Sequence, residues 1–203
     1  MFVQIMEQDP AAAGVVQELT FEITPKPLFY NAHVPTIWSG LQLTPNLTDL
    51  TLNLPATTPP SVFTGVHFAR LHFLRTNLPH RVLVSFLSHH PTLSDLVMGP
   101  CGTSRACPLA DVDLSHVTVL ECSATCLAHV AHCDLNHLTV RRGSSRPSID
   151  FASLPIAASL CSLTIDFFAS DRDVLSGIAL FAPFLRKLSL LERTCRSVSE
   201  LGP

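Results

Sequence analysis

Apolar residues recur along the chain at a fixed spacing of a little over twenty positions. The stretch from Pro91 to Gly102 shows the unit, which has apolar residues at its first, fourth and sixth places and a cysteine at its ninth: Leu93, Leu96, Met98 and Cys101. The same order starts again at Leu114 and ends on Cys122. Alternate residues of a strand point to the same face, so places four and six predict two inward side chains of a short strand. Two successive matches predict a repeat protein.

Further units follow the same order, with apolar residues at places one, four and six. They begin at Leu47, Phe68, Leu93, Leu114, Leu135, Leu160 and Leu185. Successive units start 21 or 25 residues apart, within the spacing of leucine-rich repeats. An eighth match at Val16, Leu19 and Phe21 requires an insertion before Leu47. We therefore expect an α/β leucine-rich-repeat solenoid of about seven to eight repeats, with a curved parallel sheet on its concave side and helices or irregular returns on its convex side.

The expected domain organisation is one continuous solenoid over residues 47–203, preceded by a degenerate repeat and an irregular loop over residues 1–46. Pro25, Pro27 and Pro35 predict the irregular loop, with a helical turn near 37–41. Neither end shows a clear polar capping repeat, and solenoids need such caps. This favours a piece of a longer protein.

The returns between strands differ in length and pattern. A helix is expected after Pro79, and a second one after Asp171 as N-cap. Their apolar faces are Val82, Leu83, Phe86 and Leu87, and Val174, Leu175, Ile178 and Phe181. A poorer helix at 149–156 is interrupted by Pro155, and the segment 55–60 predicts a loop. The 21-residue units have room only for a turn or an extended return.

Places three, five and seven of each unit should face outward on the concave sheet. They form a strip with hydroxyls along its middle, charges and histidines on one flank, and the exposed leucines Leu74, Leu120 and Leu191 on the other. Such a strip suits a protein partner better than a polyanion or a small apolar ligand, although single positions can be merely solvated. The candidate binding residues are Arg70, His72, Leu74, Asp95, Val97, His116, Thr118, Leu120, His137, Thr139, Arg141, Thr164, Asp166 and Lys187.

Composition limits the partners and the compartment. Charged residues make up 14% of the chain, against roughly 25% in typical soluble domains, so the surface is rich in other polar residues or normally lies against something else. A net charge of -3 argues against nucleic acid. No uncharged stretch is long enough to span a membrane, and the N-terminus lacks the basic region of a secretory signal. Seven cysteines without such a signal favour reduced thiols in the cytoplasm or nucleus. We expect a monomer.

A local cysteine and histidine cluster is the main candidate for a metal site: Cys122, Cys126, His129, His132, Cys133 and His137. Its composition is that of a zinc site, but its spacing is not, because Cys126, His129 and Cys133 could share a helix face without a fourth ligand. We therefore interpret the cluster as buried cysteines and surface histidines and expect no metal or cofactor. The pair His89 and His90 is interpreted as a structural contact at the carbonyl end of a helix.

Catalysis is not expected. The sequence contains no nucleophile elbow, no phosphate-binding loop and no H-E-x-x-H motif, and its eight glycines leave few phosphate-cradling loops.

The run LPHRVLVSFLSHHPTLSDLVMGPC, from Leu78 to Cys101, together with LTDLTLNL and LRKLSLL, resembles the degenerate leucine-rich-repeat regions of fungal F-box proteins. The resemblance covers about residues 47–191. It implies the substrate-recognition solenoid of a cullin-type ubiquitin ligase. The segment 28–43 is broken by proline and lacks the amphipathic helices of an F-box, so a Skp-type adaptor is expected to bind only a longer form that has one. The alternatives are a cysteine and histidine metal protein, or a scaffold unrelated to ubiquitin.

Overall fold

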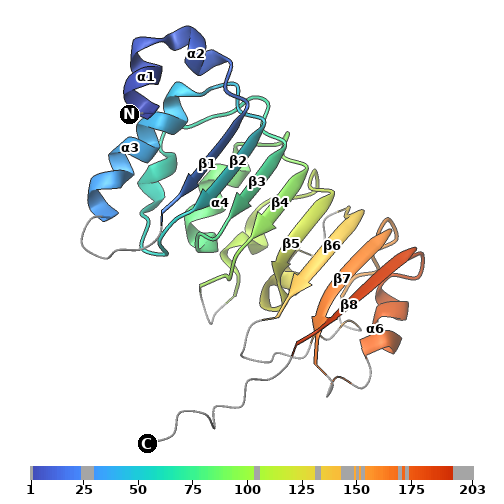
Figure 1. Ribbon diagram of the computed structural model, residues 1–203. Coiled ribbons are helices and arrows are strands. Elements are labelled where there is room, and N and C mark those ends of the chain that lie inside the picture. Colours follow the sequence, from blue (N-terminus) through green and yellow to red (C-terminus); the bar gives the residue numbers. More distant parts are fainter. Residues whose placement is uncertain are drawn as a thin grey trace, which may run out of the picture.

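The computed structural model describes residues 2–23, 30–102, 106–130, 134–142, 149, 151, 154–168, 171 and 174–193. They form one eight-stranded sheet in which all strands are parallel and follow the order of the sequence (Figure 1). The strands are β1 (Glu18–Glu22), β2 (Asp49–Asn53), β3 (Phe73–Thr76), β4 (Asp95–Met98), β5 (Val119–Ser123), β6 (His137–Arg141), β7 (Ser162–Phe167) and β8 (Lys187–Glu192).

Parallel neighbours cannot be joined by a tight hairpin, so each strand is followed by a return segment that brings the chain back to the start of the next one. The α-helices of the described chain are α1 (Phe2–Gln8), α2 (Pro10–Gly14), α3 (Tyr30–Leu43), α4 (His80–Ser88), α5 (Leu127–Val130) and α6 (Val174–Phe181). Three returns contain short 3-10 helices, η1 (Pro60–Phe63), η2 (Pro108–Asp111) and η3 (Ala124–Cys126). One strand with one return per unit gives a solenoid-like α/β arrangement.

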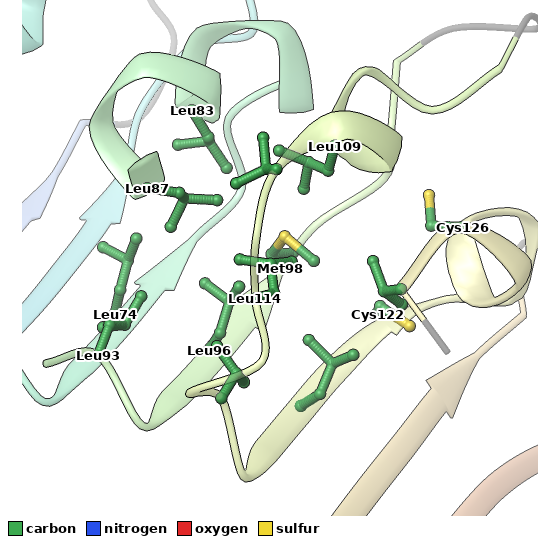
Figure 2. Close-up of a cluster of buried hydrophobic side chains, with 14 of the residues drawn as sticks. Leu74, Leu83, Leu87, Leu93, Leu96, Met98, Leu109, Leu114, Cys122 and Cys126 are labelled. Carbon is green, nitrogen blue, oxygen red and sulfur yellow. The ribbon is translucent and has the colours of Figure 1, made fainter. Parts of the chain in front are cut away.

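The core lies between the sheet and these returns. The leucines at the centre of the strands are almost completely buried: Leu50, Leu74, Leu96, Leu120, Leu138 and Leu163. Figure 2 shows how Leu83 and Leu87 of α4 and Leu109 of η2 pack over Leu74, Leu96 and Met98 of the strands. The opposite face of the sheet carries no helix in the described chain, and we call it the open face.

The predicted repeats have the correct register in six of the eight strands. Leu19 of β1 pairs with Leu50, Leu138 of β6 pairs with Leu163, and Leu163 pairs with Leu188 of β8. Leu96 at the fourth place of its unit is fully buried in β4. The weak eighth match before the insertion is therefore a strand of the same sheet.

The register is wrong in β3 and β5. Leu74, not Leu71, pairs with Leu50, and Leu120, not Val117, pairs with Leu96. Both units begin three residues later than predicted. Because alternate residues face opposite sides of a sheet, an odd shift exchanges the inward and outward residues. Leu74 and Leu120, predicted to be exposed, are core residues that are at most 1% exposed.

The insertion after β1 contains a long helix where an irregular loop was predicted. α3 runs for 14 residues through Pro35, and the predicted turn at 37–41 is its centre. Ile37 and Leu41, one helical turn apart, are both buried, and the Trp38 indole donates a hydrogen bond to the Thr64 carbonyl. This tertiary packing offsets the cost of a proline inside a helix. Pro25 and Pro27 lie outside the described residues.

The two predicted return helices are confirmed as α4 and α6. All four apolar residues of the first face are buried, whereas in α6 Ile178 and Phe181 are buried and Leu175 is 57% exposed. Asp171 accepts hydrogen bonds from the Phe168 backbone and the Arg142 side chain. The segment 55–59 is a loop, as predicted. Within the described residues, no helix is both long enough and apolar enough to cross a membrane.

Candidate functional site

Seven of the predicted binding residues face outward on the open face, and they are at least partly exposed: Asp95, Val97, His137, Thr139, Arg141, Thr164 and Lys187. Arg70, His72, His116 and Thr118 lie instead in the segments that lead into β3 and β5. The register shift replaces the predicted residues of these two strands by Phe73, Arg75, Val119 and Glu121. A three-residue offset within the repeat therefore caused the sequence prediction to miss these four.

Asp166 has the predicted strand position, but its side chain is only 1% exposed. Its carboxylate lies 3.6 Å from Arg141 Nη1 and 3.0 Å from Arg193 Nη2, and it accepts a hydrogen bond from the Arg142 backbone. Arg141 also donates to Glu121 at 2.9 Å, which is the main reason that the pKa of Arg141 is raised. These charges form a row of alternating sign across β5 to β8, which we call the charged row. Its members neutralise one another.

A hollow of about 400 Å³ opens on the other half of the open face, at the carboxyl ends of β1 to β5. Most of its lining residues are polar, among them Thr20, Glu22, Thr51, Asn53, Arg75, Asn77 and Glu121, and Leu52, Val97 and Met98 add an apolar part. The sequence prediction included only Val97 of these among its binding residues.

Arg75 carries the positive charge of this hollow. Its guanidinium lies over the Phe73 ring at 5.9 Å, and within the described chain no carboxylate reaches it at salt-bridge distance. The two nearby carboxylates have partners, because Glu22 accepts a hydrogen bond from Asn53 and Glu121 accepts one from Arg141. An arginine fork presents planar donors that match a carboxylate.

The pair His89 and His90 has the structural role that was predicted. Each Nδ1 donates to a carbonyl one turn earlier, His89 to Ser85 at 2.6 Å and His90 to Phe86 at 2.7 Å. Since Nδ1 of His90 donates, its Nε2 accepts the backbone N–H of Phe68 at 3.0 Å. Burial is the main cause that lowers the pKa of His90. The neutral ring therefore joins two returns.

A second group of chemistry-bearing side chains lies inside the molecule, on the helix-covered side of the sheet. His80, Cys101, Cys107 and Cys126 are all buried, and their ligand atoms lie within 4.8 Å of one another. His80 Nδ1 is 3.2 Å from the Cys107 sulfur and 3.6 Å from the Cys126 sulfur. We call these four residues the Cys/His cluster. It is not the local group that the sequence suggested.

The thiols of the cluster interact electrostatically. A hydrogen bond from Cys126 is the main cause that lowers the pKa of Cys107 to about 4, whereas burial opposes the shift. The same hydrogen bond raises the pKa of Cys126, and burial adds to the increase. Cys107 is thus the more acidic thiol of the pair.

Of the cysteines and histidines predicted as metal candidates, only Cys126 belongs to the Cys/His cluster. Cys122 is a buried residue of β5 and occupies the sixth place of its unit, not the ninth (Figure 2). His137 is exposed on the open face, and His129 lies on α5. His132 and Cys133 lie outside the described residues. Cys101, at the ninth place of its unit, belongs to the cluster.

The chain has no counterpart in two comparisons with known proteins. Neither a scan against protein-family models nor a search of curated proteins produced a match.

Proposed function

We propose that the chain is a leucine-rich-repeat solenoid that recognises a protein partner on its open face, without catalysing a reaction. The repeat assignment is supported by one parallel strand per unit, by sequential strand order and by leucines at the strand centres and strand entries. The observation that carries the binding proposal is the polar hollow around Arg75, whose guanidinium has no ion-pair partner within the described chain.

The chemistry of the hollow indicates what the partner presents. Threonine and asparagine side chains offer donors and acceptors to an extended backbone, and Arg75 offers a bidentate site for a carboxylate. We therefore propose an extended protein segment with an acidic side chain. The charged row lies beside the hollow, and it is less suited to binding because its charges are mutually paired.

Selection of displayed peptides on the immobilised protein, followed by calorimetric titration, tests the proposal. We expect enriched peptides to carry an acidic residue, and Arg75→Ala to weaken their binding by about 10- to 100-fold, since a hydrogen bond to a charged group contributes roughly 1.5–3 kcal/mol. Arg186→Ala is the matched control, because Arg186 is an exposed arginine outside the hollow. Equal affinity of both variants for the selected peptides, or no enrichment at all, would contradict the proposal.

The resemblance to fungal F-box proteins extends this proposal to the substrate-binding part of a ubiquitin-ligase receptor. Co-purification of a longer form of the protein with a Skp-type adaptor tests this extension. If that longer form contains an F-box and does not bind the adaptor, the ligase role is wrong and the recognition surface stands alone.

A further inference from the structure

We propose that His80, Cys101, Cys107 and Cys126 bind one zinc ion as a structural Cys3His site. This inference does not depend on the function proposed above, because the cluster lies under the helix-covered face of the sheet and the recognition surface lies on the open face.

The separations of the ligand atoms are close to those of a zinc centre. Tetrahedral zinc holds sulfur at about 2.3 Å and nitrogen at about 2.0–2.1 Å, which places the ligand atoms roughly 3.5–3.8 Å apart. The two separations from His80 Nδ1 to sulfur are 3.2 and 3.6 Å, and all four ligand atoms lie within 4.8 Å of one another. Small side-chain rotations are enough to form the tetrahedron.

The histidine tautomer is already that of a ligand. His80 Nε2 lies 3.2 Å from the carbonyl oxygen of Gly99, and because a carbonyl only accepts, Nε2 carries the proton. The lone pair of Nδ1 then points toward the cysteines. Most zinc-bound histidines donate their other N–H to a carbonyl or a carboxylate in this way, and this contact fixes the ring orientation.

The backbone brings the first two ligands together. Gly102 has a φ of +74°, and a Cβ at this position would lie 3.2 Å from the Pro79 side chain. A turn with a positive φ and so close a neighbour favours glycine. It places Cys101 beside the first residue of α4, where the His80 N–H donates to the Cys101 carbonyl at 3.3 Å.

The composition of the cluster favours zinc over a disulfide or plain hydrogen bonds. A disulfide would join only two of the three sulfurs, and none is formed among the described cysteines. Thiols are weak donors, so three of them and an imidazole stabilise a buried site poorly by hydrogen bonding alone. Three sulfur ligands and one nitrogen in a closed buried site are the donor set of structural zinc.

The position of the cluster explains what the metal would do. His80 belongs to the return after β3, Cys101 and Cys107 to the return after β4, and Cys126 to the return after β5. In their described residues, the last two returns contain the short 3-10 helices η2 and η3 and the four-residue α5. Zinc would join three successive returns, two of which have only short helices in the described residues.

Metal analysis of the untagged purified chain tests the proposal. After dialysis we expect about one zinc per chain, and the double variant Cys107→Ser with Cys126→Ser should lose it. Cys161→Ser is the matched control, since it removes a described cysteine outside the cluster, and it should retain zinc. Zinc retained by the double variant, or lost with Cys161→Ser, would place the metal elsewhere and overturn the proposal.

Cobalt substitution provides a readout that does not depend on a folded serine variant. Cobalt added to zinc-depleted wild-type protein should give tetrahedral ligand-field bands and a thiolate-to-cobalt charge-transfer band. His80→Cys should still bind cobalt with a shifted spectrum, because it replaces one ligand by another. A metal-free wild-type protein that is folded by circular dichroism and gives no cobalt spectrum would overturn the proposal, as would two missing thiols in a titration of the denatured chain.

Discussion

The repeats of β4 and β8 carry the same pattern of strand residues, yet they are buried to different degrees. In β4, Leu96 is fully buried and Met98 is 4% exposed, whereas in β8 Leu188 is 38% exposed and Leu190 is half-buried. β4 has a paired strand on each side and lies under α4 and η2, whereas β8 pairs only with β7 in the described chain. Burial in a repeat is therefore supplied by the neighbouring repeats as much as by its own sequence.

The polar contacts differ between the same two regions. The returns around β4 converge on the Cys/His cluster inside the molecule. The strands β5 to β8 are linked by the charged row, which runs over the open face and includes half-exposed arginines. The contacts of the Cys/His cluster are buried away from solvent. The ion pairs of the charged row are open to solvent and are screened by salt.

The largest expected effect is the difference in stability loss when the strand-centre leucine is replaced in β4 and in β8. Leu96→Asp should unfold the chain, because an unpaired charge in a packed layer costs several kcal/mol against a total stability of about 5–15 kcal/mol. Leu188→Asp should cost roughly 1 kcal/mol, since the new carboxylate can reach water. Urea denaturation followed by circular dichroism measures both. Asp95→Asn, beside Leu96 on the open face, is the control and should be nearly silent. Equal losses at positions 96 and 188 would show that the two repeats are equally packed.

Removal of the metal should have the second-largest effect, because it lowers the stability of the middle repeats. If zinc is bound at about 1,000 times its dissociation constant, it contributes about 4 kcal/mol, which corresponds to about 8–16 °C in melting temperature for a chain of this size. A zinc chelator should lower the melting temperature of wild-type protein and leave that of the double variant Cys107→Ser with Cys126→Ser unchanged. Hydrogen exchange should increase first in α4 and α5. An unchanged melting temperature, or exchange that begins in β7 and β8, would contradict this expectation.

The charged row should contribute less than the metal. Asp166→Asn keeps the size of the side chain and removes the charge that faces Arg141 and Arg193, so we expect a loss of about 1–2 kcal/mol. The loss stays small because both arginine side chains are about half exposed and can turn to water. Chemical denaturation at low and high salt measures it, and the difference from wild type should shrink with salt. A difference that does not depend on salt would mean that Asp166 acts mainly through its hydrogen bond from the Arg142 backbone.

The smallest expected effect is the change of folding stability with pH that His90 causes in the middle repeats. The folded-state pKa of His90 is lower than its ordinary value of 6.5, chiefly through burial, and the nearby His67 and His89 act in the same direction. The contribution of His90 to stability is therefore complete above about pH 6.5. It decreases as the pH falls from 6.5 toward the folded-state pKa, because only the unfolded chain binds the proton in that interval. At pH 6 the loss should stay below about 1 kcal/mol.

The unfolding free energy of wild-type protein and of His90→Gln, measured from pH 7.5 to pH 5, tests the His90 prediction. The variant starts from a lower stability, so the slope with pH is compared and not the absolute value. The slope below pH 6.5 should be smaller in the variant. Parallel slopes would show that His90 does not titrate differently in the folded chain.

The sequence predicts the sheet well because the strand-centre leucines recur in most units. It fails in β3 and β5 for a particular reason. The sixth place of the true β3 unit is Thr76, a buried threonine whose hydroxyl accepts the Leu78 N–H, and the template required an apolar residue there. In β5 two overlapping sets of apolar residues fit equally well, and the more even spacing selected the wrong one. Only pairing with neighbouring strands distinguishes the two registers.

The Cys/His cluster could not be predicted from spacing. Its members belong to three returns, and no pair of them has the short separation of a zinc-binding motif. The cysteines and histidines between 122 and 137 are close in sequence, whereas the fold brings together residues one repeat apart. A search for cysteine or histidine in successive returns would have found His80, Cys101 and Cys126.

The Cys/His cluster also changes how this chain should fold. In a linear array each unit contacts only its neighbours, so folding can start anywhere and spread by single steps. Four side chains from three successive units meet at one point here, so the cluster is complete only when the unit of β5 has joined those of β3 and β4. This couples second neighbours and makes the segment from 80 to 126 one cooperative block, with the flanking repeats free to open separately.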